Sequence, residues 1–218
     1  YIIRCHVVII PSMPLSKLFP RKFLVFLFLL FFCFLLVLYL APEEKTMGAG
    51  IKSVYAHVAL IWTGMLGMLI AGVLGIALTI FNRQKIYAWM MRIGWVTLGV
   101  FVLSAIVSII AQIINWNGIF WDEPRSVVQF QTLAAFIIAQ VAIQWLPWYR
   151  VRGLVVGVTV VVILTVIRLA PLVLHPENPI GTSNSSGIQF TFLILFALST
   201  LGAGGVVWQV QMRLGARV

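Results

Sequence analysis

The feature that most constrains this chain is a series of six long apolar runs separated by short polar connections. Each run is long enough for a transmembrane helix, which needs roughly 20 apolar residues to cross the hydrocarbon core of a bilayer. Hydrophobic residues make up 62% of the 218 residues, charged residues only 9%, and the mean hydropathy is +1.08. This composition excludes an ordinary soluble domain. We therefore predict an all-α integral membrane protein with six transmembrane helices.

The predicted spans end at prolines, acidic pairs and short basic turns. They cover residues 23–40, 53–81, 87–114, 127–145, 154–174 and 188–210. Together they form one six-helix domain over residues 20–212, between an N-terminal arm at 1–19 and a tail at 213–218. Met13 reads like a natural start, so residues 1–12 are either upstream sequence or a true arm. Glycines in the second span predict close packing with other helices, because small residues let backbones approach in lipid. They are Gly64, Gly67, Gly72 and Gly75.

The charged residues predict the orientation of the spans. Cations flank alternate ends of the spans, and the positive-inside rule assigns those ends to the cytoplasm. They are Lys17, Arg21, Lys22, Arg83, Lys85, Arg150, Arg152, Arg213 and Arg217. The opposite ends hold all five carboxylates, Glu43, Glu44, Asp122, Glu123 and Glu177. We therefore expect both termini in the cytoplasm of a prokaryote, with the protein in its inner (plasma) membrane. The net charge of +10 reflects this topology and anionic lipid head groups, not a nucleic-acid partner.

Two histidines are predicted to lie at one depth on the outer side. His57 is about one turn inside the second span, and His175 follows the fifth span. Two neutral imidazoles on different helices are what axial ligation of a haem iron requires. The alternative is that each histidine is only a polar anchor at the membrane surface.

Aromatic and charged residues concentrate in the loop after the third span. Trp116 and Trp121 precede Asp122 and Arg125. Indole rings can cover a flat apolar macrocycle, and a guanidinium can pair with its propionates. The alternative is an aromatic belt, since tryptophan favours the interface in any membrane protein.

Polar residues inside the spans add less to this hypothesis. Arg168 lies inside the predicted fifth span and either pairs with a propionate or extends to the outer surface. Gln129 and Gln131 are close enough to the tryptophan loop to line its floor. Apart from Arg168, we expect no charge within the spans except near their ends.

The order of these features resembles the haem-handling membrane proteins of cytochrome c biogenesis, of the CcmC and CcsA type, over roughly residues 20–212. That family has an outer histidine, a tryptophan-rich loop ending in Trp-Asp, and a second outer histidine. Here His57, Trp121-Asp122 and His175 follow in that order, and Tyr55-Ala56-His57-Val58 with Trp62 is similar to the family's Tyr-x-His-Val segment. The loop is shorter than the family's by about one residue and has Phe120 and Glu123-Pro124 instead of the family residues.

The resemblance implies a function that makes and breaks no covalent bond, so we expect no enzyme activity. His57 and His175 would be axial ligands of a non-covalently bound haem b, and Trp116, Trp121 and Asp122 would present its edge at the outer surface. The partners would be a haem chaperone or an apocytochrome c, together with membrane lipids. The alternative is an accessory structural subunit of a respiratory or photosynthetic membrane complex with the same fold. A small-solute transporter ranks last, because the spans carry few charges and no obvious inverted repeat.

Overall fold

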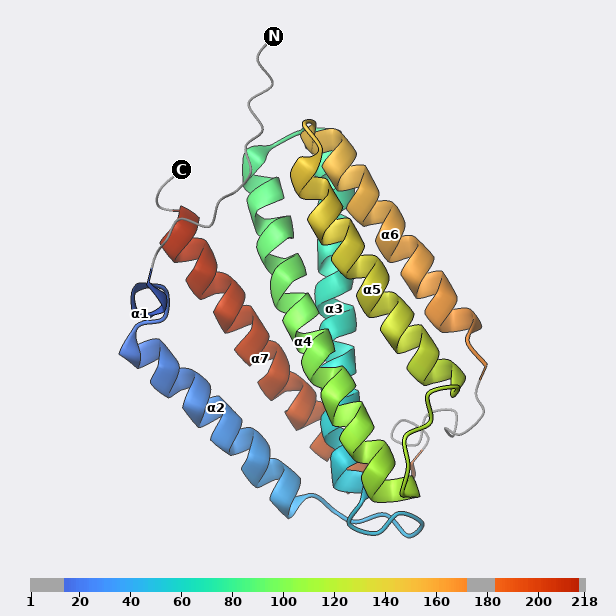
Figure 1. Cartoon of the computed structure of the whole chain (residues 1–218). Coiled ribbons are helices and arrows are strands. Elements are labelled where there is room, and N and C mark those ends of the chain that lie inside the picture. The colour runs from blue at the N-terminus through green and yellow to red at the C-terminus, as the bar shows by residue number, and fades with distance from the viewer. Residues whose placement is uncertain (1–13, 172–182, 216–218) are drawn as a thin grey trace.

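The computed structural model describes residues 14–171 and 183–215, and it is a bundle of helices (Figure 1). Six of the helices are long and apolar enough to cross a membrane, as the sequence predicts. The helices are α1 (Leu15–Leu18), α2 (Arg21–Leu40), α3 (Ile51–Phe81), α4 (Gln84–Trp116), α5 (Pro124–Trp145), α6 (Tyr149–Leu169) and α7 (Ser186–Gly215). The short helix α1, in the N-terminal arm, has no counterpart among the predicted spans.

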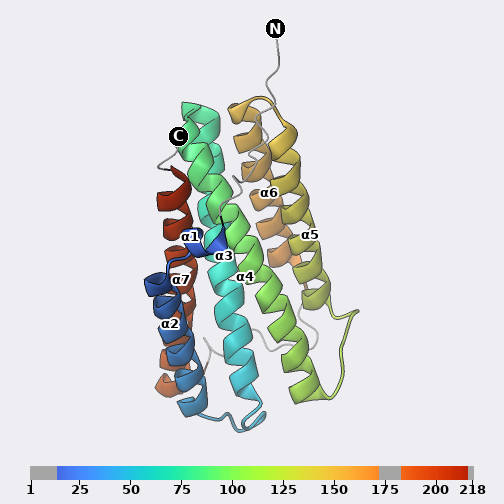
Figure 2. The ribbon, with the colours of Figure 1, turned by 60° about the vertical axis from the view of Figure 1, so that its left-hand side comes forward.

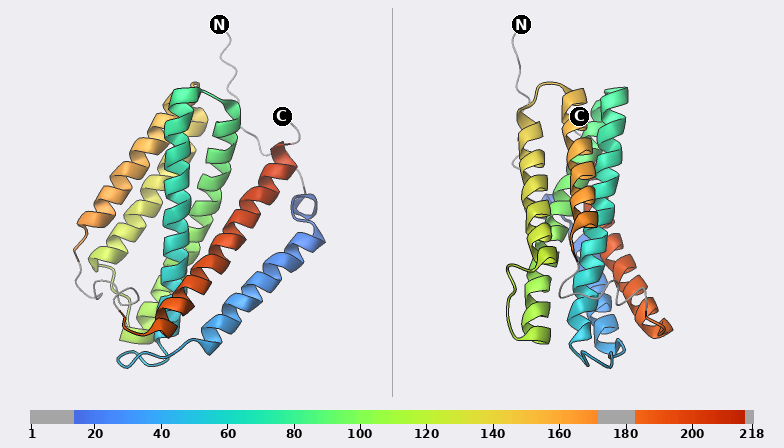
Figure 3. Two further views of the ribbon diagram at one scale, coloured as in Figure 1. Left: turned by 180° about the vertical axis from the view of Figure 1, so that it is seen from behind. Right: turned by 90° about the vertical axis from the view of Figure 1, so that its right-hand side faces the viewer.

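The long helices lie side by side in three pairs (Figure 2). Helices α3 and α4 occupy the centre, α5 and α6 lie on one side, and α2 and α7 lie on the other. From behind, α3 lies between α6 and α7 (Figure 3). The main apolar core is formed by α3, α4, α5 and α6, with fully buried side chains at Met68, Phe101, Phe136 and Val156.

Helix α2 is the least embedded of the long helices. It packs mainly on α7 and contributes no buried residue of its own. A smaller apolar cluster joins the end of α2 to α3 and α7 through Ala41, Ile51, Tyr55 and Leu195. Most of the α2 surface is therefore left for acyl chains to cover.

Glycines bring α3 and α6 into backbone contact. A Cβ atom placed on Gly75 would lie 2.7 Å from the carbonyl oxygen of Gly153, and one placed on Gly153 would overlap the Gly75 carbonyl oxygen. Gly72 faces Val160 in the same interface, and Gly64 faces Phe101 of α4. The prediction that these glycines mark helix packing is confirmed.

Prolines move two helix boundaries away from the predicted spans. We expected the fifth span at 154–174, but α6 runs from Tyr149 to Leu169. Pro171 disfavours helical geometry at the preceding residue, so hydropathy alone placed that end too late. Helix α5 begins three residues earlier than expected because Pro124 occupies its first turn, where a missing N–H costs nothing. Arg168 is consequently the second-to-last residue of α6 and is exposed, not embedded in the span.

The two ends of the bundle differ in charge. We call the end with the connections at 41–50 and 117–123 the acidic end, because it holds Glu43, Glu44, Asp122 and Glu123. The opposite end, with the connections at 82–83 and 146–148, is the basic end. The start of α2 and the end of α7 point toward the basic end (Figure 1).

Candidate functional site

His57 lies near the acidic end of α3 and turns its ring toward α4. Its Nδ1 atom is 3.2 Å from the backbone carbonyl oxygen of Ser104 and 3.3 Å from the Ser104 hydroxyl. A carbonyl oxygen only accepts hydrogen bonds, so this contact favours the tautomer that has its proton on Nδ1. The lone pair then lies on Nε2. A hydrogen bond from one ring nitrogen to a backbone carbonyl is the usual support for a histidine that binds metal through the other.

Polar side chains extend from His57 across α4 to α5. Gln129 Nε2 donates to Ser104 Oγ at 3.4 Å, and Gln112 Nε2 donates to Ser126 Oγ at 3.2 Å. The Gln112 side-chain oxygen accepts from the backbone N–H of Phe120 at 2.9 Å, which fixes the loop to α4. We call His57, Ser104, Gln112, Ser126 and Gln129 the acidic-end cluster. In an apolar surrounding each such bond avoids the cost of an unpaired polar group.

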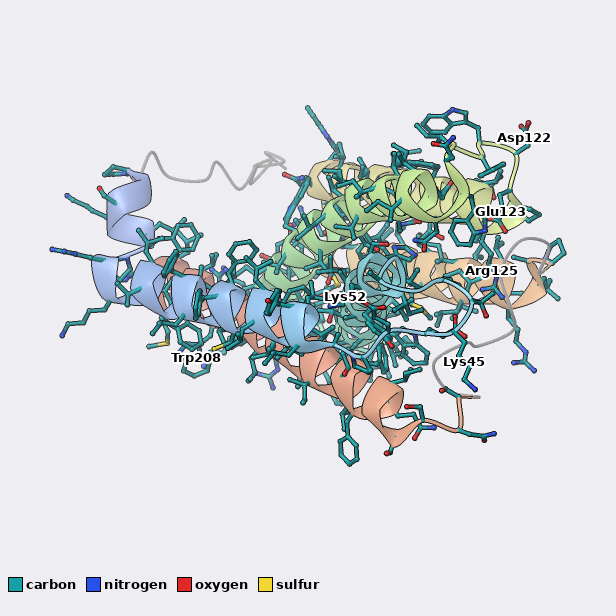
Figure 4. The ribbon with its side chains drawn as sticks, turned by 90° about the horizontal axis from the view of Figure 1, so that it is seen from below. Lys45, Lys52, Asp122, Glu123, Arg125 and Trp208 are labelled. Atoms are coloured by element: carbon teal, nitrogen blue, oxygen red, sulfur yellow. The ribbon has the colours of Figure 1, made fainter. Side chains whose placement is uncertain are left out.

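The loop after α4 is held by caps at both of its ends. Asn117 ends α4 in the left-handed conformation, with φ of 54°. Glu123 is almost fully buried and caps α5 by accepting from the backbone N–H of Ser126 at 2.8 Å. Asp122 is exposed and points away from the helices (Figure 4). The predicted site residue Asp122 therefore faces solvent, and its neighbour Glu123 is the buried acid.

A small hollow lies between α4, the loop and α5. Trp121 is 58% exposed, and its ring centroid is 5.9 Å from that of Phe130. The hollow is a shallow depression with no enclosed space for a water molecule, unlike the sites of roughly 300–1,000 Å³ that enclose a drug-sized ligand. Its lining includes Gln112, Phe120, Trp121, Ser126, Gln129 and Phe130.

The other predicted site residues are placed less favourably. Arg125 is half-buried in the first turn of α5, and its Nε atom is shielded without a hydrogen-bond partner. Trp116 is the half-buried last residue of α4, while Arg168 is exposed at the end of α6. His175 lies outside the described residues, so the predicted pairing with His57 stays a prediction. Of the two glutamines expected to line the floor, Gln129 does so and Gln131 is exposed.

The connection between α2 and α3 completes the acidic end. Glu44 accepts hydrogen bonds from the backbone N–H groups of Met47 at 3.0 Å and Thr46 at 2.7 Å. These bonds, with that from Met47 the larger, hold the pKa of Glu44 below its ordinary value because they favour the charged carboxylate. Asn115 at the end of α4 donates to the carbonyl oxygen of Gly50 at 3.2 Å. Both described loops at this end are thus anchored to α4.

Sequence reasoning missed Ser104 and Gln112 as members of the site. A signal for both was present, because Ser104, Ser108 and Gln112 recur every four residues in an otherwise apolar helix. This spacing places all three on one helix face. Such a polar stripe in an apolar span indicates a face turned toward the protein interior.

No family model matches this chain, and neither a characterised protein nor a solved structure matches it.

Proposed function

We propose that the acidic end of this membrane protein binds haem as cargo and presents it for cytochrome c assembly. The observation that carries the proposal is the contact between His57 Nδ1 and the Ser104 carbonyl oxygen. This contact favours a lone pair on Nε2, the form of histidine that binds iron. Two further features support it: the aromatic lining of the neighbouring hollow, and the Nε of Arg125, which has no hydrogen-bond partner among the described residues.

Each residue has a distinct role in this proposal. His57, through Nε2, and His175 would hold the haem iron. Arg125 pairs with a propionate, while Trp121 and Phe130 cover one edge of the macrocycle. Most of the cargo stays outside the hollow, where a haem chaperone or an apocytochrome c can reach it. The protein itself makes and breaks no covalent bond.

Absorption spectra of the purified protein test the proposal. We expect haem titrated into the wild-type protein in mild detergent to give the Soret band of a histidine-ligated haem. The double variant His57→Ala/His175→Ala should lose this band. His6→Ala is the matched control, because it removes a histidine in the N-terminal arm and should leave the band unchanged. Haem that binds equally to the double variant would contradict the ligand assignment.

A second function remains open because of the exposure of α2. This helix buries none of its own residues, which suits a subunit that packs against another membrane protein as well as one that faces lipid. We therefore also consider an accessory subunit of a respiratory or photosynthetic complex. Stoichiometric co-purification with a large redox complex, together with normal cytochromes c in a deletion strain, would favour this alternative over haem delivery.

The orientation in the membrane is part of the same proposal. We infer that the basic end faces the cytoplasm of a prokaryotic cell, in accordance with the distribution of lysine and arginine. In a background without Cys5 and Cys33, a cysteine replacing Ser183 should react with an impermeant thiol reagent applied from outside. A cysteine replacing Gln84 should not react. The reverse pattern would place the haem-binding end in the cytoplasm.

A further inference from the structure

Arg92 is a cation inside α4, at a position that the sequence analysis passed over. It is half-buried, and its Nη1 atom is shielded from solvent without a hydrogen-bond partner. Arg92 comes eight residues after the first residue of α4, which has 33 residues. At 1.5 Å per residue this is about 12 Å along a helix of about 50 Å. A hydrocarbon core of about 30 Å therefore begins close to Arg92 when the helix is centred in it.

Arg152, a second arginine at the basic end, has partners for its guanidinium within the bundle. Arg152 is 5% exposed, and its Nε donates to the carbonyl oxygen of Leu146 at 2.6 Å. Its guanidinium carbon lies 4.7 Å from the ring centroid of Tyr87 and 5.3 Å from that of Tyr149. Stacked rings and a carbonyl oxygen replace the water that Arg152 gives up. Arg92 has no comparable partner among the described residues.

Among residues 14–171 and 183–215, Arg92 has no counter-charge nearby. The described carboxylates, Glu43, Glu44, Asp122 and Glu123, all lie at the acidic end. A charge near the edge of the hydrocarbon core is costly unless it is paired or extends to the head groups. At this depth the available anions are the phosphates of lipids.

The surroundings of Arg92 suit a lipid. One turn away, Trp89 contacts Trp208 of α7, with ring centroids 6.2 Å apart, and indole rings favour the head-group region. Seven residues further along the same face of α4, Gly99 is exposed and has nothing within 4 Å of the place a Cβ would occupy. The helix surface beyond Arg92 is therefore open to an acyl chain.

We propose that Arg92 binds the phosphate of an anionic phospholipid in the leaflet at the basic end. The accessible part of the guanidinium reaches toward the head groups and pairs with phosphate oxygens. The acyl chain lies along the face that contains Gly99. This site is at the opposite end of the bundle from His57 and does not depend on haem binding.

Native mass spectrometry with defined lipids tests this site. We expect the wild-type protein, offered equal amounts of phosphatidylglycerol and phosphatidylcholine in mild detergent, to retain phosphatidylglycerol preferentially. Arg92→Gln should weaken that retention by about tenfold or more, because it removes a charge-assisted hydrogen bond. Arg150→Gln is the matched control, since Arg150 is an exposed cation at the same end, and it should retain the lipid as wild type does. Equal retention by Arg92→Gln and wild type would overturn the proposal.

Two further measurements distinguish the remaining outcomes. If inorganic phosphate at millimolar concentration displaces the lipid, Arg92 is a general phosphate site and the lipid assignment is wrong. If Arg92→Gln fails to fold, Arg92→Lys replaces it, because this variant keeps the charge. The test is then the Tm of each protein in phosphatidylglycerol nanodiscs compared with its Tm in phosphatidylcholine nanodiscs. The proposal expects a higher Tm in phosphatidylglycerol for the wild type, a smaller shift for Arg92→Lys, and an unreduced shift for Arg150→Gln. An equal Tm in both lipids would contradict it.

Discussion

Gln112, at the acidic end of α4, uses both atoms of its amide group, whereas Gln140, in the basic half of α5, uses neither. Both side chains are buried. Gln112 joins α4 to the loop and to α5. Gln140 of α5 packs directly against Gly94 of α4. Burial of a polar side chain therefore does not by itself indicate that it belongs to a hydrogen-bond network. At the acidic end most of these polar groups are paired, with the Nε of Arg125 as an exception. In the basic half, Arg92 Nη1 and both side-chain atoms of Gln140 have no hydrogen-bond partner among the described residues.

The largest effect is expected where the basic half is packed most tightly. Gly153→Leu would push a side chain into the backbone of α3 at Gly75 and should destabilise the protein by about 3 kcal/mol or more. Gly99→Leu is the control, because that position is open, and it should have little effect. Unfolding in mixed detergent micelles measures both. If Gly153→Leu is as stable as the wild type, the helices of the basic half can move apart. Its unpaired polar groups could then find partners, and the difference from the acidic end would disappear.

Removal of the partnered amide should be harmful. Gln112→Leu leaves the Phe120 N–H without its acceptor and removes the donor to Ser126, so we expect a loss of about 2 kcal/mol. The same unfolding assay measures it. Gln131→Leu replaces an exposed glutamine of α5 and should be close to neutral. A stable Gln112→Leu variant would show that the acidic-end cluster does not hold the loop.

Removal of the unpartnered amide should have the opposite sign. Gln140→Leu replaces a buried group that makes no hydrogen bond through its side-chain atoms with an apolar one of similar size, and we expect a gain of about 1 kcal/mol. The difference in sign between Gln112→Leu and Gln140→Leu is the sharpest form of the comparison. Destabilisation by Gln140→Leu would indicate that water or a ligand uses this amide.

A smaller effect is expected at Ser104, in the acidic-end cluster. Ser104→Ala removes the hydroxyl that accepts from Gln129 but keeps the carbonyl oxygen that contacts His57. We expect a loss of about 1 kcal/mol in the free energy of unfolding. The Soret band of bound haem should be retained. A band lost in this variant but restored by Ser104→Thr would make the hydroxyl, not the carbonyl group, the positioning partner of His57.

The smallest effect concerns Glu44 and depends on pH. Because the pKa of Glu44 is lowered in the folded protein, its contribution is present above the ordinary glutamate pKa and is lost as the pH falls through the lowered value. The protection factors of the Thr46 and Met47 amides, which correct for the intrinsic pH dependence of exchange, should therefore fall on acidification, and Glu44→Gln should remove most of that change. An unchanged pH dependence in Glu44→Gln would assign the transition to another group.

The sequence was sufficient for the spans but not for the contacts between them. An apolar run of the required length dictates a transmembrane helix wherever it lies, so six helices could be predicted without any tertiary information. Hydropathy failed at Pro171, where backbone sterics end α6 before the apolar residues do. The geometry of proline, not the composition, set that boundary.

The candidate site was only partly predictable for a related reason. His57 and Trp121 stand out as residue types, but the partner of His57 depends on how α4 is rotated against α3. That rotation is fixed by packing, including that of Phe101 on Gly64, which no local pattern encodes. For the same reason the sequence singled out Asp122, whereas Glu123 is the acid that caps α5.

The position of α2 has a consequence for how the chain is made. Its main partner, α7, begins roughly 150 residues after α2 ends. At 5–20 residues per second, a ribosome needs about 7 to 30 seconds to synthesise that stretch. During this interval α2 has to persist in the bilayer with acyl chains as its only neighbours on that side. Helix α2 is strongly apolar and buries none of its residues, so it can remain stable among acyl chains until α7 is made. Its uniformly apolar composition therefore has a role in biosynthesis.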